Sequence, residues 1–138
     1  MYQRKLIKLI VRKESNCLTK SIQIGIDNSK FETICWMDAD YSHHPKFLKN
    51  IIIPVMHQNF DVAVNIRRFF LRKDYKFLPG ILSFFLNIFL RITLDFKFQD
   101  YTSGFICIKK KIFKNYKLVG DYGEYFVDLI YYCIKKKI

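Results

Sequence analysis

Hydrophobic residues along the chain change repeatedly between short continuous runs and stretches with helical spacing. Short apolar runs are typical of buried strands, whereas apolar positions that recur every three or four residues indicate helices. The runs predict strands over 5–11, 33–37 and 61–66, and a short strand after the turn that opens 99–108. The spaced positions predict helices over 19–28, 45–58, 78–94 and 121–137, and a basic helical start over 109–114. Such alternation predicts one α/β domain with a mostly parallel sheet flanked by helices on both faces.

Two acidic residues follow the apolar run 33–37 directly, and they suggest a site for a cation. Asp38 and Asp40 are separated only by the small residue Ala39. In an extended backbone such alternate side chains lie on one face, about 7 Å apart. Divalent cations take oxygen ligands, and α/β sheets bind ligands at the carboxyl ends of their strands. The pattern predicts that both carboxylates bind Mg²⁺ or Mn²⁺ together with a diphosphate, and a simple acidic turn is the alternative.

Three segments carry a resemblance to a known family. Residues 37–45 read MDADYSHHP, residues 100–105 read DYTSGF, and Arg67 follows the apolar run DVAVNI. These segments resemble family 2 glycosyltransferases, in particular the dolichyl- or polyprenyl-phosphate mannose and glucose synthases. The resemblance implies a GT-A (Rossmann-like) fold that is incomplete at both ends, because the family's first two strands and its C-terminal segment have no counterpart here. A split or truncated reading frame and a partner chain that supplies the rest are the two explanations.

For such an enzyme the resemblance implies transfer of a hexose, with inversion, from GDP-mannose or UDP-glucose to a polyprenyl or dolichyl phosphate. It implies that Asp38 lies nearer the nucleotide sugar and that Asp40 contacts the metal. Asp100 would be a catalytic residue beside the sugar and the acceptor, and Gly104 would let the backbone approach the nucleotide sugar closely. An aspartate before Thr-Ser also caps turns, so Asp100 has a purely structural alternative.

The resemblance further assigns cationic residues to phosphate groups. Arg67 would contact the acceptor phosphate or the diphosphate during catalysis, since a guanidinium suits phosphate oxygens. Pro79 stands where the family has a second arginine, so that acceptor-phosphate contact is either missing or supplied by Arg72. Asp128 matches an acidic position that would orient an active-site lysine or arginine, and Glu124 is the alternative acid.

His43 and His44 lie between the acidic pair and the predicted helix at 45–58. Imidazole nitrogens can bind a metal or a phosphate, and they can equally pack against the core or cap the helix that follows. Both interpretations remain open from the sequence.

Charge and hydropathy indicate the partners. The formal net charge is +12, from 24 Lys and Arg against 12 Asp and Glu, which favours nucleotide phosphates, anionic lipids or nucleic acid. No nucleic-acid partner is expected, because the chain has no RNP-type or helix-turn-helix pattern. Residues 78–94 predict an amphipathic helix that belongs to the core or lies on a membrane surface. The expected location is peripheral, at the cytoplasmic face of a membrane.

Three classes of function follow. The chain is a glycosyltransferase or its central part, or it is a non-catalytic remnant that keeps the fold pattern. The third class is a basic module for a membrane surface or nucleic acid, in which the acidic pair is incidental. A sheet without its first two strands would expose an unpaired edge, so the isolated chain is expected to be poorly soluble.

Overall fold

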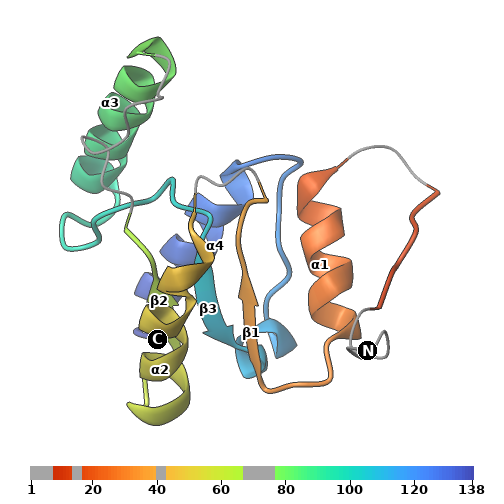
Figure 1. Cartoon of the computed structure of the whole chain (residues 1–138). Coiled ribbons are helices and arrows are strands. Elements are labelled where there is room, and N and C mark those ends of the chain that lie inside the picture. Colours follow the sequence, from red (N-terminus) through yellow and green to blue (C-terminus); the bar gives the residue numbers. More distant parts are fainter. Residues whose placement is uncertain (1–7, 14–16, 40–42, 67–76) are drawn as a thin grey trace.

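A computed structural model describes residues 8–13, 17–39, 43–66 and 77–138, with side chains from residue 81 onward in the last range. Helices alternate with strands along the chain (Figure 1). The α-helices are α1 (Leu18–Asn28), α2 (Leu48–His57), α3 (Phe77–Thr93) and α4 (Glu124–Lys135). The strands are β1 (Thr33–Trp36), β2 (Val62–Val64) and β3 (Ile106–Lys109), and the 3₁₀ turns are η2 (Pro45–Phe47) and η4 (Lys110–Lys114). The predicted α/β class is confirmed.

The sheet has three strands in the order β1-β3-β2. Cys107 in the middle of β3 lies opposite Cys35 of β1 and opposite Ala63 of β2, and both pairings are antiparallel. The prediction of a mostly parallel sheet is therefore wrong for the described strands. β1 and β2 do run in the same direction, but the crossover through α2 leaves one strand position between them. β3 occupies that position and runs antiparallel to both neighbours. A local hydrophobic pattern carries no information about the direction of a strand in the sheet.

The prediction of a strand over 5–11 is also wrong where it can be compared. Residues 8–13 form no regular element, and Leu9 and Val11 are exposed. A strand is stabilised by pairing with a neighbour and by side chains packed on one face. No partner strand for this segment lies within the described ranges, so its apolar pattern alone does not order it as a strand.

Helices cover both faces of the sheet, because side chains of a strand alternate between its faces. Ile106 and Ile108 of β3 pack into one buried cluster with residues of α4. Phe105 and Cys107 belong to a second cluster with α2. Figure 1 shows α2 in front of the strands and α4 behind them. The core is therefore a helix–sheet–helix sandwich in which β3 contributes to both layers.

The helical spacing of apolar residues predicts an inner face for two helices, namely Phe47, Leu48, Ile51, Ile52 and Val55 over 45–58, and Phe126, Leu129, Ile130 and Cys133 over 121–137. On α4 every predicted position is buried, namely Phe126, Leu129, Ile130 and Cys133. On α2, Ile51 and Val55 are buried as predicted, but Phe47 is 37% exposed. Phe47 lies in η2, where the tighter 3₁₀ turn rotates it away from the face that continues into α2.

The start of α1 is joined to the loop that precedes α4. The N–H of Leu18 donates to the Asp121 carbonyl oxygen at 3.0 Å, and the Thr19 hydroxyl donates to the Tyr122 carbonyl oxygen at 3.3 Å. These bonds satisfy donors at a helix terminus that have no partner within the helix. They also place the first residue of α1 beside the first turn of α4, at the end of the sheet where β1 finishes.

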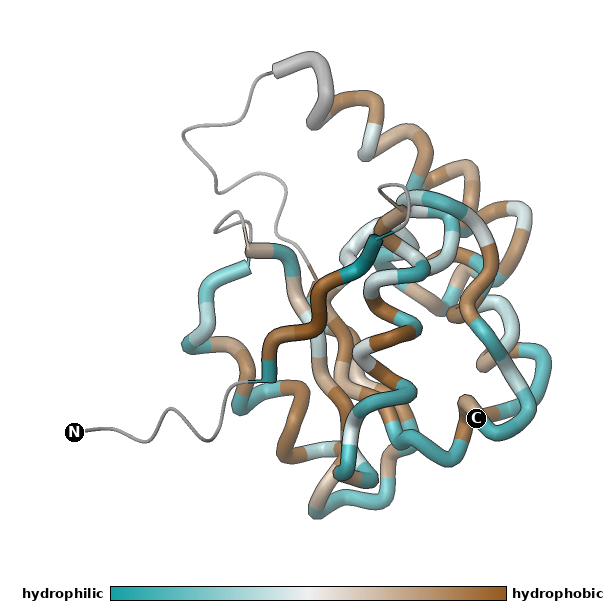
Figure 2. Tube along the Cα trace, turned by 90° about the vertical axis from the view of Figure 1, so that its right-hand side faces the viewer, coloured by the Kyte–Doolittle hydropathy of each residue, from teal (hydrophilic) through white to brown (hydrophobic). Residues whose placement is uncertain are grey.

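Hydrophobic residues continue along α3, which extends away from the sheet (Figures 1 and 2). Four large side chains at spacings of three, four and three residues are each 61% to 71% exposed. These residues, which we call the outer stripe, are Leu82, Phe85, Phe89 and Ile92. Within the described part of the chain no helix is long and apolar enough to cross a membrane.

Asp61, just before β2, is expected to make the stability of the chain depend on pH. Its Oδ1 lies 2.7 Å from Lys111 Nζ and 3.0 Å from Lys109 Nζ. The hydrogen bond from Lys111, supported by Lys109, lowers the pKa of Asp61. The resulting stabilisation is fully present above the unfolded pKa of about 3.9, and it is lost as the pH falls through the lower folded value.

Asp61→Asn should therefore lower the free energy of unfolding by up to about 1 kcal/mol near neutral pH, because the pair is partly exposed and screened. The difference from wild type should shrink as the pH falls through the lowered pKa of Asp61, so it is compared at neutral and at acidic pH. Thermal unfolding followed by circular dichroism at both pH values measures it. Glu32→Gln, which removes an exposed carboxylate at the same end of the sheet, is the matched control. An equal deficit at both pH values would contradict the ion-pair explanation.

Candidate functional site

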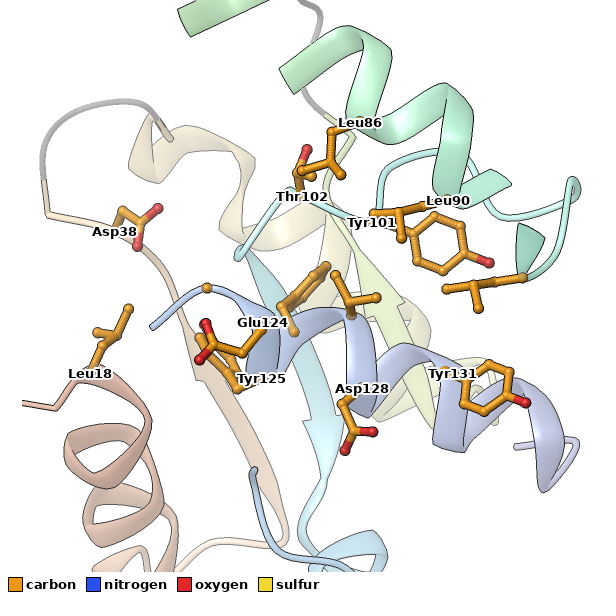
Figure 3. A pocket seen from close by; sticks show the side chains of 14 residues that line it. Leu18, Asp38, Leu86, Leu90, Tyr101, Thr102, Glu124, Tyr125, Asp128 and Tyr131 are labelled. Carbon is orange, nitrogen blue, oxygen red and sulfur yellow. The ribbon is translucent and has the colours of Figure 1, made fainter. Parts of the chain in front are cut away.

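A cavity of about 720 Å³ opens at the end of the sheet where β1 finishes. Its walls come from five parts of the chain, which are the start of α1, Asp38 after β1, the inner side of α3, the loop before β3, and the first turns of α4 (Figure 3). The loop before β3 contributes Tyr101 and Thr102. Most lining side chains are apolar, and the carboxylates of Asp38, Glu124 and Asp128 are the acidic groups among those described.

Asp38 and the DYTSGF loop lie against one another at this cavity. Gly104 has φ +69°, a left-handed conformation that favours glycine. A Cβ built on Gly104 would lie 3.5 Å from Asp38 Oδ2. Two segments that the sequence marked separately are thus brought together, with an exposed carboxylate beside a backbone that has no side chain in the way.

His43 joins the loop after β1 to the loop before β3. It is 1% exposed, and its ring centroid lies 5.0 Å from that of Phe105. Nε2 donates to the Ser103 carbonyl oxygen at 2.8 Å, because a carbonyl can only accept. The Ser103 hydroxyl in turn donates to the carbonyl oxygen of Asn65, just after β2. One network therefore joins His43 to the loop before β3 and to the residue that follows β2.

His44 has a different contact. Its Nδ1 accepts the backbone N–H of Lys46 at 3.1 Å and so caps η2. For both histidines the contacts seen are those of the packing-and-capping interpretation rather than of a metal or phosphate ligand.

Asp100 is buried at 1% exposure and organises its own turn. Oδ1 accepts the backbone N–H and the hydroxyl of Thr102, each at 3.0 Å. Tyr101 and Thr102 line the cavity, whereas Asp100 is not among the lining residues. The turn-capping role is thus visible, and the catalytic role of Asp100 stays a prediction.

The two carboxylates of α4 have identifiable partners. Glu124 Oε1 accepts the N–H of Asp121 at 2.7 Å, and backbone N–H groups, that of Asp121 first, lower the pKa of Glu124. Asp128 Oδ2 accepts the Tyr116 hydroxyl at 2.6 Å. Burial, and next the bond to Asp128, raise the pKa of Tyr116. The expected lysine or arginine beside Asp128 is replaced by a tyrosine among the described contacts, because Tyr116 packs against the same side of α4.

Tyr125 is a cavity residue that the sequence did not indicate. Its hydroxyl accepts the indole N–H of Trp36 at 3.1 Å, which ties the end of β1 to the first turn of α4. Burial raises the pKa of Tyr125, and the nearby Asp38 carboxylate adds to this rise while the Trp36 bond opposes it. Nothing in the sequence distinguishes Tyr125 from the other tyrosines, since its role depends on a contact with a residue far away in the chain.

Three of the predicted site residues lie outside the described ranges, namely Asp40, Arg67 and Arg72. Within those ranges no group of three or more His, Cys, Asp or Glu side chains could hold a metal ion. Asp38 offers the hard oxygen donor that Mg²⁺ or Mn²⁺ prefers, and it is exposed at the cavity. The described half of the acidic pair therefore fits a cation, and the complete metal site stays a prediction.

Comparison with known proteins decides the family. Residues 1–117 of the 138 match the family described as glycosyl transferase family 2. The chain belongs to glycosyl transferase family 2. It is also 25% identical, over 135 residues, to the uncharacterized protein MJ0544 of Methanocaldococcus jannaschii. That similarity covers 87% of this chain and 56% of the relative, so the chain spans little more than half the relative's length.

Gly104→Ala tests the close approach between the two motifs. Forcing alanine into the left-handed conformation should cost about 1–2 kcal/mol of the free energy of unfolding. The distance of 3.5 Å to Asp38 is an ordinary contact, so the cost should come from the backbone. Gly25→Ala in α1 is the control, since its Cβ meets nothing within 4 Å and should stabilise the helix by about 0.5–1 kcal/mol. Chemical denaturation measures both, and a Gly104→Ala protein as stable as wild type would refute the strained turn.

Proposed function

We propose that this chain is the donor- and acceptor-binding centre of an inverting hexosyltransferase, which moves a hexose from GDP-mannose or UDP-glucose to a polyprenyl or dolichyl phosphate. The observation that carries the proposal is the position of the Asp38 carboxylate, which lines the cavity and whose Oδ2 lies 3.5 Å from the place that a Cβ on Gly104 would occupy. A carboxylate beside an unobstructed backbone suits a nucleotide diphosphate held through a cation. The rest of the catalytic domain would come from further segments or from a partner chain.

In this proposal Asp38 and Asp40 bind Mg²⁺ or Mn²⁺, which would offset the negative charge of the departing nucleoside diphosphate. The acceptor phosphate is already an anion, so a strong general base is not required. The protein then acts mainly by holding the two reactants in line and by stabilising charge. Arg67 and Arg72 would bind the acceptor phosphate, and Asp100 would hold the loop that faces the sugar.

The lipid character of the acceptor has support of its own. Leu86 and Leu90 of α3 form the cavity wall opposite Asp38 (Figure 3). On its far side the same helix carries the outer stripe, exposed to solvent. An anionic lipid surface would cover this stripe and attract a chain of net charge +12. A peripheral position on the cytoplasmic face of a membrane would thus bring a lipid phosphate beside the cavity.

Removal of the second carboxylate tests the metal site. Asp40→Ala should abolish metal-dependent binding of the nucleotide sugar, because one remaining carboxylate holds a divalent cation weakly. Calorimetric titration of GDP-mannose and UDP-glucose, with Mn²⁺ and with a chelator, measures the loss. Asp27→Asn on α1, an exposed carboxylate away from the cavity, is the control. Unchanged affinity in Asp40→Ala would refute the metal role, and a wild-type chain that binds neither sugar nucleotide would favour a non-catalytic remnant.

Charge placed on the outer stripe tests the membrane surface. The double variant Phe85→Glu, Phe89→Glu should lower co-sedimentation with vesicles of phosphatidylcholine and phosphatidylglycerol by at least about tenfold, since each buried Phe contributes about 1.5–3 kcal/mol. Val119→Glu, Tyr122→Glu changes two other exposed apolar residues and is the control. If the wild-type protein does not bind vesicles but is a dimer, and the double variant is a monomer, the outer stripe binds a second copy of the chain instead.

A further inference from the structure

Asn87 is a buried amide on the inner face of the apolar helix α3. It is 7% exposed, and Leu90 and Leu94, one and two helical turns further on, pack against the main core cluster. Burying an amide in such surroundings is costly unless its polar atoms are bonded. The partners of Asn87 are not in α3 but in the loop that leads to β3, and they lie on either side of Asp100.

Both polar atoms of the Asn87 side chain bind that loop. Nδ2 donates to the Gln99 carbonyl oxygen at 2.7 Å, and Oδ1 accepts the Tyr101 N–H at 2.9 Å. The Gln99 carbonyl and the Tyr101 N–H belong to the two peptide units that share the Cα of Asp100. A single side chain of α3 therefore fixes both backbone torsions of Asp100.

The loop held in this way has little freedom of its own. The Tyr101 hydroxyl donates to the Asp95 carbonyl oxygen at 3.1 Å, and its ring lies 4.8 Å from that of Phe98. Tyr101 is fully buried and lines the cavity together with Thr102 and Leu90. A displacement of α3 would thus move the cavity wall and the Asp100 turn together.

The opposite side of α3 carries the outer stripe, with its four large apolar side chains exposed. α3 therefore has an apolar face directed outward, which a lipid surface could cover, and the side chain of Asn87 directed inward, which binds the loop before β3. A ligand that binds α3 can order the loop at 99–105 only if it binds the ordered form of the helix more tightly than the disordered form. A lipid surface that buries the stripe would supply that difference, because it stabilises the helix in its folded, seated form.

We propose that Asn87 is a positioning residue that couples binding of α3 to an anionic lipid surface with ordering of the Asp100 loop. The proposal rests on the function proposed above, since it assumes that the outer stripe meets the membrane. It adds a reason for a glycosyltransferase of this kind to work at the surface where its lipid acceptor is found. The loop that carries Asp100 would be ordered only when α3 is bound to the lipid surface.

Hydrogen exchange of the full chain tests the coupling. Vesicles of phosphatidylcholine and phosphatidylglycerol in equal amounts should slow exchange of the amides in 99–105 by about tenfold, as expected for a locally opening segment that becomes ordered. Asn87→Leu keeps the size and burial of the side chain but removes both hydrogen bonds. This variant should sediment with vesicles as wild type does, while vesicles no longer change exchange in 99–105.

Thr93→Val on the same helix loses a bond from its hydroxyl to the Phe89 carbonyl oxygen, and this bond does not involve residues 99–105. This variant should keep the vesicle-dependent protection of 99–105. If the loss of any polar group on α3 were enough to remove that protection, Thr93→Val would remove it too. Protection that persists in Asn87→Leu, or wild-type protein that does not bind the vesicles, would overturn the proposal. Because the measurement needs no sugar nucleotide, a chain that binds neither GDP-mannose nor UDP-glucose yet shows Asn87-dependent protection would refute the proposed function and leave the coupling standing.

Discussion

The arrangement of the site depends on the insertion of β3, in antiparallel direction, between β1 and β2. Since β1 and β2 run the same way, their carboxyl ends lie at one edge of the sheet, and an antiparallel strand between them begins at that same edge. The loop before β3 must therefore arrive beside the loop after β1. This is why the Asp38 carboxylate lies close to Gly104 although the two residues are distant in sequence. A parallel strand in that position would have carried Gly104 to the opposite edge.

Buried polar contacts then hold the loops at that edge. His43 bonds Ser103, Ser103 bonds Asn65, and Asn87 bonds the peptides around Asp100. Each of these groups would lose free energy if it were buried without a partner, so the bonds select one arrangement of the loops as well as stabilising it. The apolar layers on the two faces of β3 supply the burial on which this selection depends.

Local sequence patterns predicted the positions of most helices and strands in this fold. They did not predict how the strands pair or which distant residues come into contact. The spacing of apolar residues on α4 predicted its inner face, because a helical period is a property of the segment itself. The direction of β3 and the lack of a strand at 8–13 both depend on which other strand lies alongside. The sequence of a single segment does not encode that neighbour. Asp38 and Gly104 were predicted from motifs. Asn87 interrupts the apolar run 78–94, but its role is not visible in the sequence because its partners lie 12 and 14 residues further along the chain.

The bond between Trp36 and Tyr125 has a practical consequence. Trp36 is the single tryptophan of the chain, and its indole N–H donates to a hydroxyl whose residue lines the cavity beside Asp38. The indole emission of the unlabelled protein therefore originates one residue behind the cavity wall, at a group bonded to the lining residue Tyr125. A small molecule that displaces the Tyr125 hydroxyl would remove this bond, so the chain carries an optical reporter of contacts at that wall.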